Sequence, residues 1–379
     1  METARVMLDL GIVLFASFIG ASILERMRLP PAIGMVLAGI LLNPFTPGFA
    51  VESREEITLF AQLGGILMMF VLGLHFEYKH VRKLGVKAFL LAGVASVAAF
   101  LGGAVAGWLF GMNLAEVLIV GALVISTSTT MALKIMEETK LNALQNSRLM
   151  QAAIVVDDLY GFIALGLISS YIGLTQAAFD EIIFSAIKML LIMVTVTVTG
   201  IRITPYIFEF FERRLPSSSL TLGTAFCLIM TYALLWFGIS PFVSAFLAGT
   251  ILTSSIRYKD VIKSITPVRN LFASVFFVSI GLLINPYHLL SGFAAVIVLS
   301  IGAIASKWLA STGMLIKFGC SLKNALKLGA STAPRGEVML IIAESVVLAN
   351  VVSPIFLAIA TGILLVSALV PATIMRILK

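Results

Sequence analysis

Residues 153–161 read AIVVDDLYG and place two adjacent carboxylates, Asp157 and Asp158, in a run that is otherwise apolar enough to cross a membrane. A carboxylate at the centre of a bilayer costs at least about 2.5 kcal/mol, and a neighbouring pair costs more. Such a pair persists only where other groups compensate it or where something binds to it. We therefore searched the rest of the sequence for compensating groups and for signs of a ligand.

The composition is that of an all-α polytopic membrane protein. The 379 residues are 60% hydrophobic and 12% charged, and continuous apolar stretches recur along the whole chain. Continuous runs exclude a transmembrane β-barrel, in which apolar and polar residues alternate. The two cysteines and three histidines show no metal-ligand spacing, and no phosphate-binding loop occurs. We therefore expect no enzyme activity, no cofactor, no nucleotide and no nucleic acid, with lipid as the surrounding partner.

The hydropathy pattern predicts thirteen membrane spans, of which the second and the ninth are short for a bilayer. They cover residues 6–24, 31–43, 57–75, 84–110, 115–136, 147–172, 180–207, 220–237, 240–255, 269–285, 291–316, 324–349 and 353–376.

The basic residues support this number of spans. In this topology 21 of the 26 Lys and Arg residues fall on one side of the membrane, whereas only Arg5 and Arg54 fall on the other. The remaining three, Lys188, Lys307 and Arg335, lie within spans. Because the basic side is cytoplasmic, we expect a cell-membrane protein with its N-terminus outside and its C-terminus in the cytoplasm.

The two halves of the chain resemble each other. The pattern P-x5-L-A-G occurs at Pro31–Gly39 and again at Pro241–Gly249, and two further matches lie at nearly the same offset. This predicts two six-helix repeats, 1–172 and 220–379, joined by a linker helix at 180–207. Six spans and one linker make an odd number, so the second repeat would be inverted, an arrangement found in secondary transporters.

Counting along the spans at about 1.5 Å per residue places the buried charges at one depth, near the middle of the membrane. The same count places two interruptions there, the hydroxyl run Ser126–Thr130 and the Pro334–Gly336 segment. Two crossing interrupted helices bring half-helix ends together, and the carboxylates and Lys307 would balance those ends. The charges concerned are Asp157, Asp158, Lys307, Arg335 and Glu337.

This order of features resembles the monovalent cation:proton antiporters, in particular the cation:proton antiporter-2 branch. The features are the interrupted helix at Ser126–Thr130, Asp157-Asp158 on the next span, the lone Lys307 on a later span, and P-R-G-E at Pro334–Glu337 on the second interrupted helix. The resemblance implies a mobile ion-translocating core within 84–172 and 291–379, a dimerisation panel within 1–76 and 220–288, and a homodimer. It implies that Asp158 binds Na⁺ or a proton and that Asp157 pairs with Lys307 when the ion is absent. Ser128, Thr129 and Thr130 would lie beside the ion.

Elementary chemistry agrees with exchange, because a buried carboxylate is neutralised by either a proton or a monovalent cation. Gated potassium-efflux members of the branch usually carry Gln-Asp and a nucleotide-binding domain. By this resemblance Asp157-Asp158 favours sodium/proton exchange, with Li⁺ as a second candidate cation. Potassium/proton antiport remains the alternative, and a sodium-coupled organic anion symporter or a channel is a more remote one. Arg335 and Glu337 are interpreted as a structural charge pair at the break, and no role is assigned to Glu344.

Overall fold

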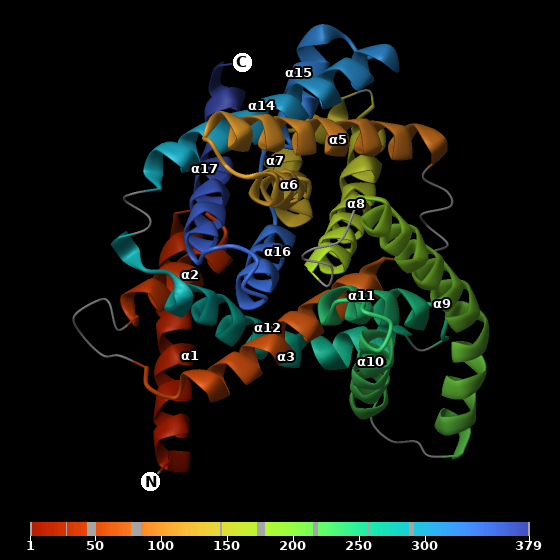
Figure 1. Cartoon of the computed structure of the whole chain (residues 1–379). Coiled ribbons are helices and arrows are strands. Elements are labelled where there is room, and N and C mark those ends of the chain that lie inside the picture. Colours follow the sequence, from red (N-terminus) through yellow and green to blue (C-terminus); the bar gives the residue numbers. More distant parts are fainter. Residues whose placement is uncertain are drawn as a thin grey trace. The chain divides into compact units, whose positions relative to one another are not determined.

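The computed structural model describes residues 2–27, 29–43, 51–76, 85–144, 146–172, 179–214, 219–256, 258–287 and 292–377 (Figure 1). Within these ranges the chain is helical and has no strand. In chain order the elements are α1 (Glu2–Arg26), α2 (Pro31–Leu41), α3 (Arg54–His75), α5 (Gly85–Leu109), α6 (Leu114–Leu123), α7 (Thr129–Glu138), η1 (Leu141–Ala143), α8 (Ser147–Ile172), α9 (Phe179–Arg214), α10 (Ser219–Leu235), α11 (Pro241–Leu252), α12 (Tyr258–Leu283), α14 (Phe293–Lys317), α15 (Leu322–Ala330), α16 (Glu337–Leu348) and α17 (Ile355–Ile377).

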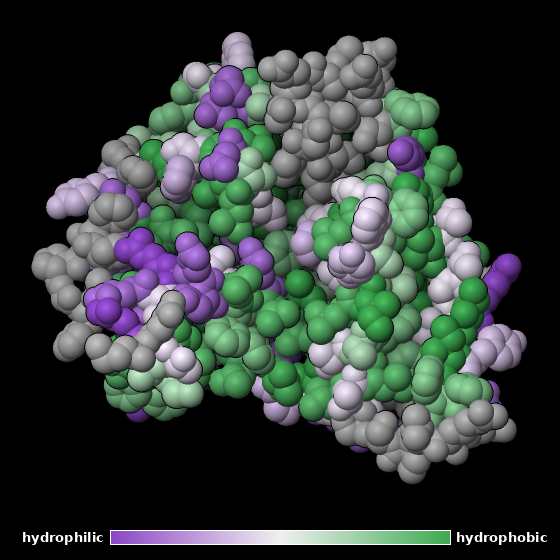
Figure 2. Space-filling model, turned by 60° about the horizontal axis from the view of Figure 1, so that its bottom comes forward, coloured by the Kyte–Doolittle hydropathy of each residue, from purple (hydrophilic) through white to green (hydrophobic). Residues whose placement is uncertain are grey.

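The length and hydrophobicity of the described helices are those of a multi-pass membrane protein. Seven of them, α1, α3, α5, α8, α9, α12 and α14, are long and apolar enough to cross a bilayer, and five shorter helices are apolar as well. The two spans predicted to be short are the helices α2, of 11 residues, and α11, of 12 residues. Each begins with a proline in its first turn, where the missing N–H costs nothing. Hydrophobic side chains cover much of the face seen in Figure 2, with hydrophilic ones gathered in patches.

Two helices extend well beyond their predicted spans. α12 begins at Tyr258 rather than near residue 269, so that Lys259 and Lys263 lie on the helix and not in a loop. α9 continues through Pro205 to Arg214. Hydropathy detects only the apolar part of a helix, whereas the backbone continues into polar turns. Asp260 in the first turn of α12 also favours a helix start at that point.

The chain forms two compact units. The first unit consists of Met1–Phe15, Glu52–Lys83 and Leu165–Ser279, and the second unit of Ala16–Val51, Leu84–Ala164 and Ile280–Lys379. In the first unit α3 packs along α11. Gly73 and Gly249 allow this contact, because a Cβ atom on Gly73 would overlap the carbonyl of Phe246 and one on Gly249 would overlap the carbonyl of Phe70. Small residues of this kind let helices approach closely in membranes.

The second unit is built around α14. This helix lies side by side with α5 (Figure 1) and also packs against α15 and α17. Gly102 and Gly302 face each other across the α5–α14 contact, and Gly102 also leaves room for Ser306. The last turn of α12, at Gly281, meets α2 at Val36 and Gly39 within the same unit. All the candidate site residues described below belong to this second unit.

Candidate ion-binding site

Both interruptions predicted from the sequence are present, and they meet. α6 ends at Leu123 and α7 begins at Thr129, while α15 ends at Ala330 and α16 begins at Glu337. Between them the backbone pairs like two short strands. Thr127 and Arg335 form an isolated antiparallel bridge, and the Ser128 N–H donates to the Pro334 carbonyl at 2.9 Å. The second break thereby satisfies the buried Ser128 N–H of the first, while side chains accept from the N–H groups of Thr127 and Arg335.

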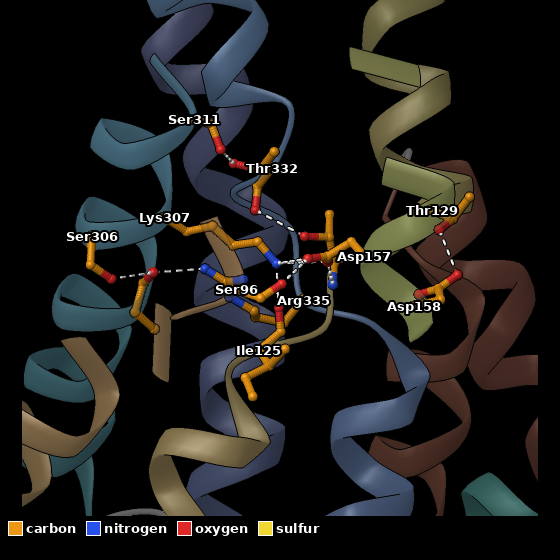
Figure 3. Close-up of polar contacts among 12 residues, drawn as sticks. Ser96, Ile125, Thr129, Asp157, Asp158, Ser306, Lys307, Ser311, Thr332 and Arg335 are labelled. Carbon is orange, nitrogen blue, oxygen red and sulfur yellow. Dashed lines mark hydrogen bonds and ion pairs between the residues drawn. The ribbon is translucent and has the colours of Figure 1, made fainter. Parts of the chain in front are cut away.

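Asp157 is enclosed by donors from three other elements (Figure 3). Its Oδ1 accepts from the Ser96 hydroxyl of α5 at 2.7 Å, and its Oδ2 accepts from the Thr127 backbone N–H at 2.9 Å. Lys307 Nζ on α14 lies 2.7 Å from Oδ1 and 2.6 Å from Oδ2. The Thr127 amide precedes the N-terminus of α7, where backbone dipoles favour a negative charge.

Lys307 is buried almost completely, with 1% of its surface exposed. Besides Asp157 it contacts the carbonyl of Ile125, just beyond the C-terminal end of α6, where a positive charge is favoured. A snorkelling lysine would have its ammonium group at the membrane surface, and this one does not. The ion pair therefore sits between the negative end of one half-helix and the positive end of another, the balance predicted from the sequence.

Asp158 points the other way (Figure 3). Adjacent residues on a helix diverge by about 100°, and here the divergence takes Asp158 away from Lys307 towards α7. Its Oδ2 accepts from the Thr129 hydroxyl at 2.9 Å, which is the one hydrogen bond that the described part of the chain gives it. Asp158 is buried as well. A carboxylate with most of its acceptor positions unused is chemically suited to a proton or to a hard monovalent cation.

The remaining predicted residues lie at the crossing in different ways. Ser128 contributes its backbone, and its side chain makes no capping hydrogen bond to α7. The side chain of Thr130 lies outside the described residues. Arg335 is buried and donates from Nη2 to the Ala303 carbonyl of α14 at 2.8 Å, while its backbone N–H donates to the Ser367 hydroxyl of α17 at 3.0 Å. Glu337 is exposed in the first turn of α16.

Two partners of Asp157 escape sequence reasoning. Ser96 is a single serine in an apolar helix, and such residues usually serve helix packing. The Thr127 contribution is a backbone N–H, which no side-chain pattern reports. A small cavity of about 10 Å³, room for one water molecule, lies beside Asp157 and Lys307 and is lined by Thr127, Thr332 and apolar residues of α5 and α8. Among the described residues no group of three or more His, Cys, Asp or Glu side chains is arranged to hold a metal ion.

Gly161 holds α8 against the first break. A Cβ atom at this position would lie 2.9 Å from Ser126 Cβ, closer than real Cβ atoms approach. We expect Gly161→Ala to destabilise the protein by about 1–3 kcal/mol, although alanine normally favours a helix. The measurement is the melting temperature of the detergent-purified variant.

A double variant tests the cause of this loss. Gly161→Ala combined with Ser126→Gly removes the opposing Cβ atom and should recover most of the lost stability. The control is Gly11→Ala, because nothing lies within 4 Å of a Cβ atom there. If the double variant were no more stable than Gly161→Ala alone, the contact with Ser126 would not be the cause.

Comparison of the sequence with models of known protein families gives one match that agrees with this geometry. The family model described as "Sodium/hydrogen exchanger, transmembrane" matches residues 13–379. The chain belongs to the sodium/hydrogen exchanger family. Members of this family are transporters, not enzymes, and exchange cations for protons.

Individual relatives of this exchanger agree with the assignment. YbaL of Escherichia coli (strain K12), named as a cation/proton antiporter, is 31% identical over 354 residues, which cover 88% of this chain and 61% of YbaL. The chain thus spans about three fifths of the length of that relative. The Na⁺/H⁺–K⁺ antiporter GerN of Bacillus cereus is 24% identical, over 88% of this chain and 86% of GerN. The sodium proton antiporter MjNhaP1 of Methanocaldococcus jannaschii shares the fold, with a TM-score of 0.77 at 16% identity, covering 100% of this chain and 98% of that one.

Proposed function

We propose that this exchanger trades a monovalent cation, Na⁺ first, for protons by alternating access, and that both compete for Asp158. The observation that carries the proposal is the unequal engagement of the two adjacent acids. Among the described residues, Asp157 is bonded by Lys307, Ser96 and the Thr127 amide, whereas Asp158 has a single hydroxyl partner. One acid is therefore committed to charge balance and the other is available for the transported ion. Thr129, with Thr130 and Ser128 beside it, would complete the ion's oxygen ligands.

The thirteen-span, inverted-repeat layout is part of the same proposal. If α6–α7 and α15–α16 each count as one interrupted span, the helices can be read as two repeats around α9. Contacts at equivalent positions support this reading: Gly249 of α11 meets Gly73 of α3, and Gly39 of α2 meets Gly281 of α12. The offset that relates Gly39 to Gly249 also relates Gly73 to Gly281, to within two residues. Each contact is therefore the counterpart of the other, as an internal two-fold axis requires.

We further propose an outside N-terminus and a cytoplasmic C-terminus, on the basis of the Lys and Arg distribution. Helices within 84–172 and 291–379 would form the ion-translocating core, and helices within 1–76 and 220–288 would form the panel through which two copies dimerise. The crossing breaks and the Asp157–Lys307 pair lie within the proposed core.

The direct test is transport by the purified protein in liposomes. With a preformed pH gradient, acid inside, reported by a pH-sensitive dye, addition of Na⁺ is expected to dissipate the gradient. Addition of K⁺ and Li⁺ in parallel decides among the cations, and the name of the relative GerN makes K⁺ the first alternative. If none of the three cations changed the gradient, the proposal would be overturned.

Competition at one carboxylate also sets the sign of the pH dependence. Lowering the pH protonates Asp158, and the cation then has to displace that proton. The apparent KM for the cation should therefore rise as the pH falls, by about tenfold per pH unit where the protonated form dominates, and should level off at alkaline pH. Initial rates measured over a range of cation concentrations at several pH values, with equal pH on both sides of the membrane, check this. A KM that does not vary with pH would contradict competition.

A further inference from the structure

A third carboxyl group lies deep in the second unit, apart from the Asp157–Asp158 pair. Glu344 on α16 is 0% exposed, and neither of its carboxyl oxygens has a hydrogen-bond partner among the described residues. An ionised carboxylate without a hydrogen bond or a counter-charge is not sustained in such surroundings, where it takes up a proton instead. Burial without a partner among these residues therefore favours the neutral, protonated form of Glu344.

The charged groups on neighbouring elements give no reason for Glu344 to ionise. α6, α17 and α8 pack against α16. α6 brings Glu116, which is engaged in the capping box at the start of that helix. α8 brings Asp157, Asp158 and Tyr160, and also Arg148 in its first turn, thirteen residues before the Gly161 contact with α16. The described side chains of α17 bring no titratable group. Among the described residues of this unit, Lys307 and Arg335 are the buried cations, and their side chains donate to Asp157, Ile125 and Ala303.

Two further polar groups lie close to the same depth. Thr361 Oγ1 on α17 and Ser300 Oγ on α14 are both buried without a hydrogen-bond partner in the described part of the chain. The bond from the Arg335 N–H to Ser367 fixes the register of α17 against the start of α16. Counted from there at about 1.5 Å per residue, Thr361 lies about 9 Å along α17 and Glu344 about 10 Å along α16 from its first residue. Because a short loop joins the two helices, they run in opposite directions and these residues reach a similar level.

Ser300 on α14 lies about one helical turn from the point where α14 contacts α17 next to Thr361. A Cβ atom on Gly362, the residue after Thr361, would contact Val296 of α14, and Ser300 lies one turn from Val296. Glu344 and these two hydroxyls thus come from three helices that pack in sequence, α16 on α17 and α17 on α14, at levels within about one or two helical turns of each other. Buried polar groups that are left unsatisfied in one state are expected to have a use in another.

The position of Glu344 on its helix connects it with the ion site. Glu337, exposed at the first turn of α16, and Glu344 are seven residues apart, so they lie on one face about two turns from each other. α16 starts at the crossing of the two breaks, next to the segment that holds Arg335. A change of conformation that hydrates this face of α16 reaches Glu337 first and Glu344 two turns later.

We propose that Glu344 is a second proton-binding site of this exchanger, which holds a proton in the conformation described here and releases it when cation binding changes the conformation of the core. This inference rests on the proposed cation/proton exchange and extends it, since the proton of Glu344 would be released in addition to the one displaced from Asp158.

The protonation of Glu344 can be tested without transport. The infrared spectrum of the purified wild-type protein should contain the carbonyl stretch of a protonated carboxylic acid that makes no hydrogen bond. Glu344→Gln should abolish this band, whereas Glu55→Gln, which changes an exposed carboxyl on α3, should leave it. Glu344→Met, which has similar length and no polar oxygen, serves as a second variant if the glutamine variant does not fold. A spectrum in which neither variant changes such a band would overturn the proposal.

Release of the proton is tested by adding Na⁺ to weakly buffered protein and measuring the pH change. Wild type and Glu55→Gln should release equal numbers of protons per cation bound, and Glu344→Gln should release fewer. If wild type and Glu344→Gln released equal numbers of protons per cation, Glu344 would keep its proton throughout, and the proposed release of a proton from Glu344 would be overturned. No release from the wild type with Na⁺, K⁺ or Li⁺ would overturn the proposed function and the release step together, whereas the infrared result would still decide the protonation of Glu344 alone.

Discussion

Replacing Asp158 with asparagine is expected to reduce cation-driven proton exchange to the level of protein-free liposomes. The substitution keeps the shape of the side chain and an oxygen that can accept from the Thr129 hydroxyl, 2.9 Å from Oδ2 in the structure. It removes the negative charge, however, and with it both the group that attracts the cation and the group that carries the proton. The loss should therefore be one of function with little loss of stability.

Two measurements separate these effects. The first is dissipation of a preformed pH gradient after addition of Na⁺, K⁺ or Li⁺. The second is the rise in melting temperature that a bound cation gives to the folded protein, which is expected for the wild type and absent from Asp158→Asn. Glu55→Gln is the matched control, because it removes one exposed carboxylate elsewhere. Exchange at the wild-type rate by Asp158→Asn would exclude Asp158 as the shared binding group.

Much of this site could be predicted because the membrane makes polarity conspicuous. Asp157, Asp158, Lys307 and Arg335 stand out in the sequence because each is costly at mid-membrane depth. The breaks were predictable for a similar reason: Pro334 cannot donate to a helix, and a run of hydroxyls competes with the helical hydrogen bonds. The structure shows both breaks and brings Asp157 to Lys307.

The parts of the site that the sequence did not predict are those that cost little free energy at this depth in the membrane. Ser96 donates to Asp157, but a serine in an apolar helix costs little free energy and gives no signal in the sequence. The Thr127 donor belongs to the backbone, which every residue has. The hydrogen bond from Arg335 to a carbonyl of α14 depends on the packing of α14 against the second break, which no charge pattern reports. The early start of α12 escaped hydropathy because its first turns are polar.

Replacing Lys307 with methionine is expected to give the largest loss of stability, about 3–5 kcal/mol, because it leaves Asp157 as a buried charge without its partner. Methionine has nearly the length of the lysine stem, so the effect is not one of a cavity. Lys307 is 1% exposed and its Nζ lies within 2.7 Å of both Asp157 oxygens, whose other donors are Ser96 and the Thr127 amide. Two neutral or backbone donors do not replace a full positive charge. The melting temperature in detergent measures the loss.

The double variant Asp157→Asn/Lys307→Met distinguishes a lost ion pair from general damage. With both charges gone, the asparagine oxygen can accept from the Thr127 N–H while its NH2 group donates to the Ser96 hydroxyl oxygen, so most of the stability should return. If the double variant were as unstable as Lys307→Met, the penalty would not come from the unpaired charge of Asp157. The same variant also tests the division of labour between the two acids. It retains Asp158 and Thr129, so it should still exchange cation for proton, but with fewer protons moved per cation if the Asp157–Lys307 pair opens and closes during the wild-type cycle.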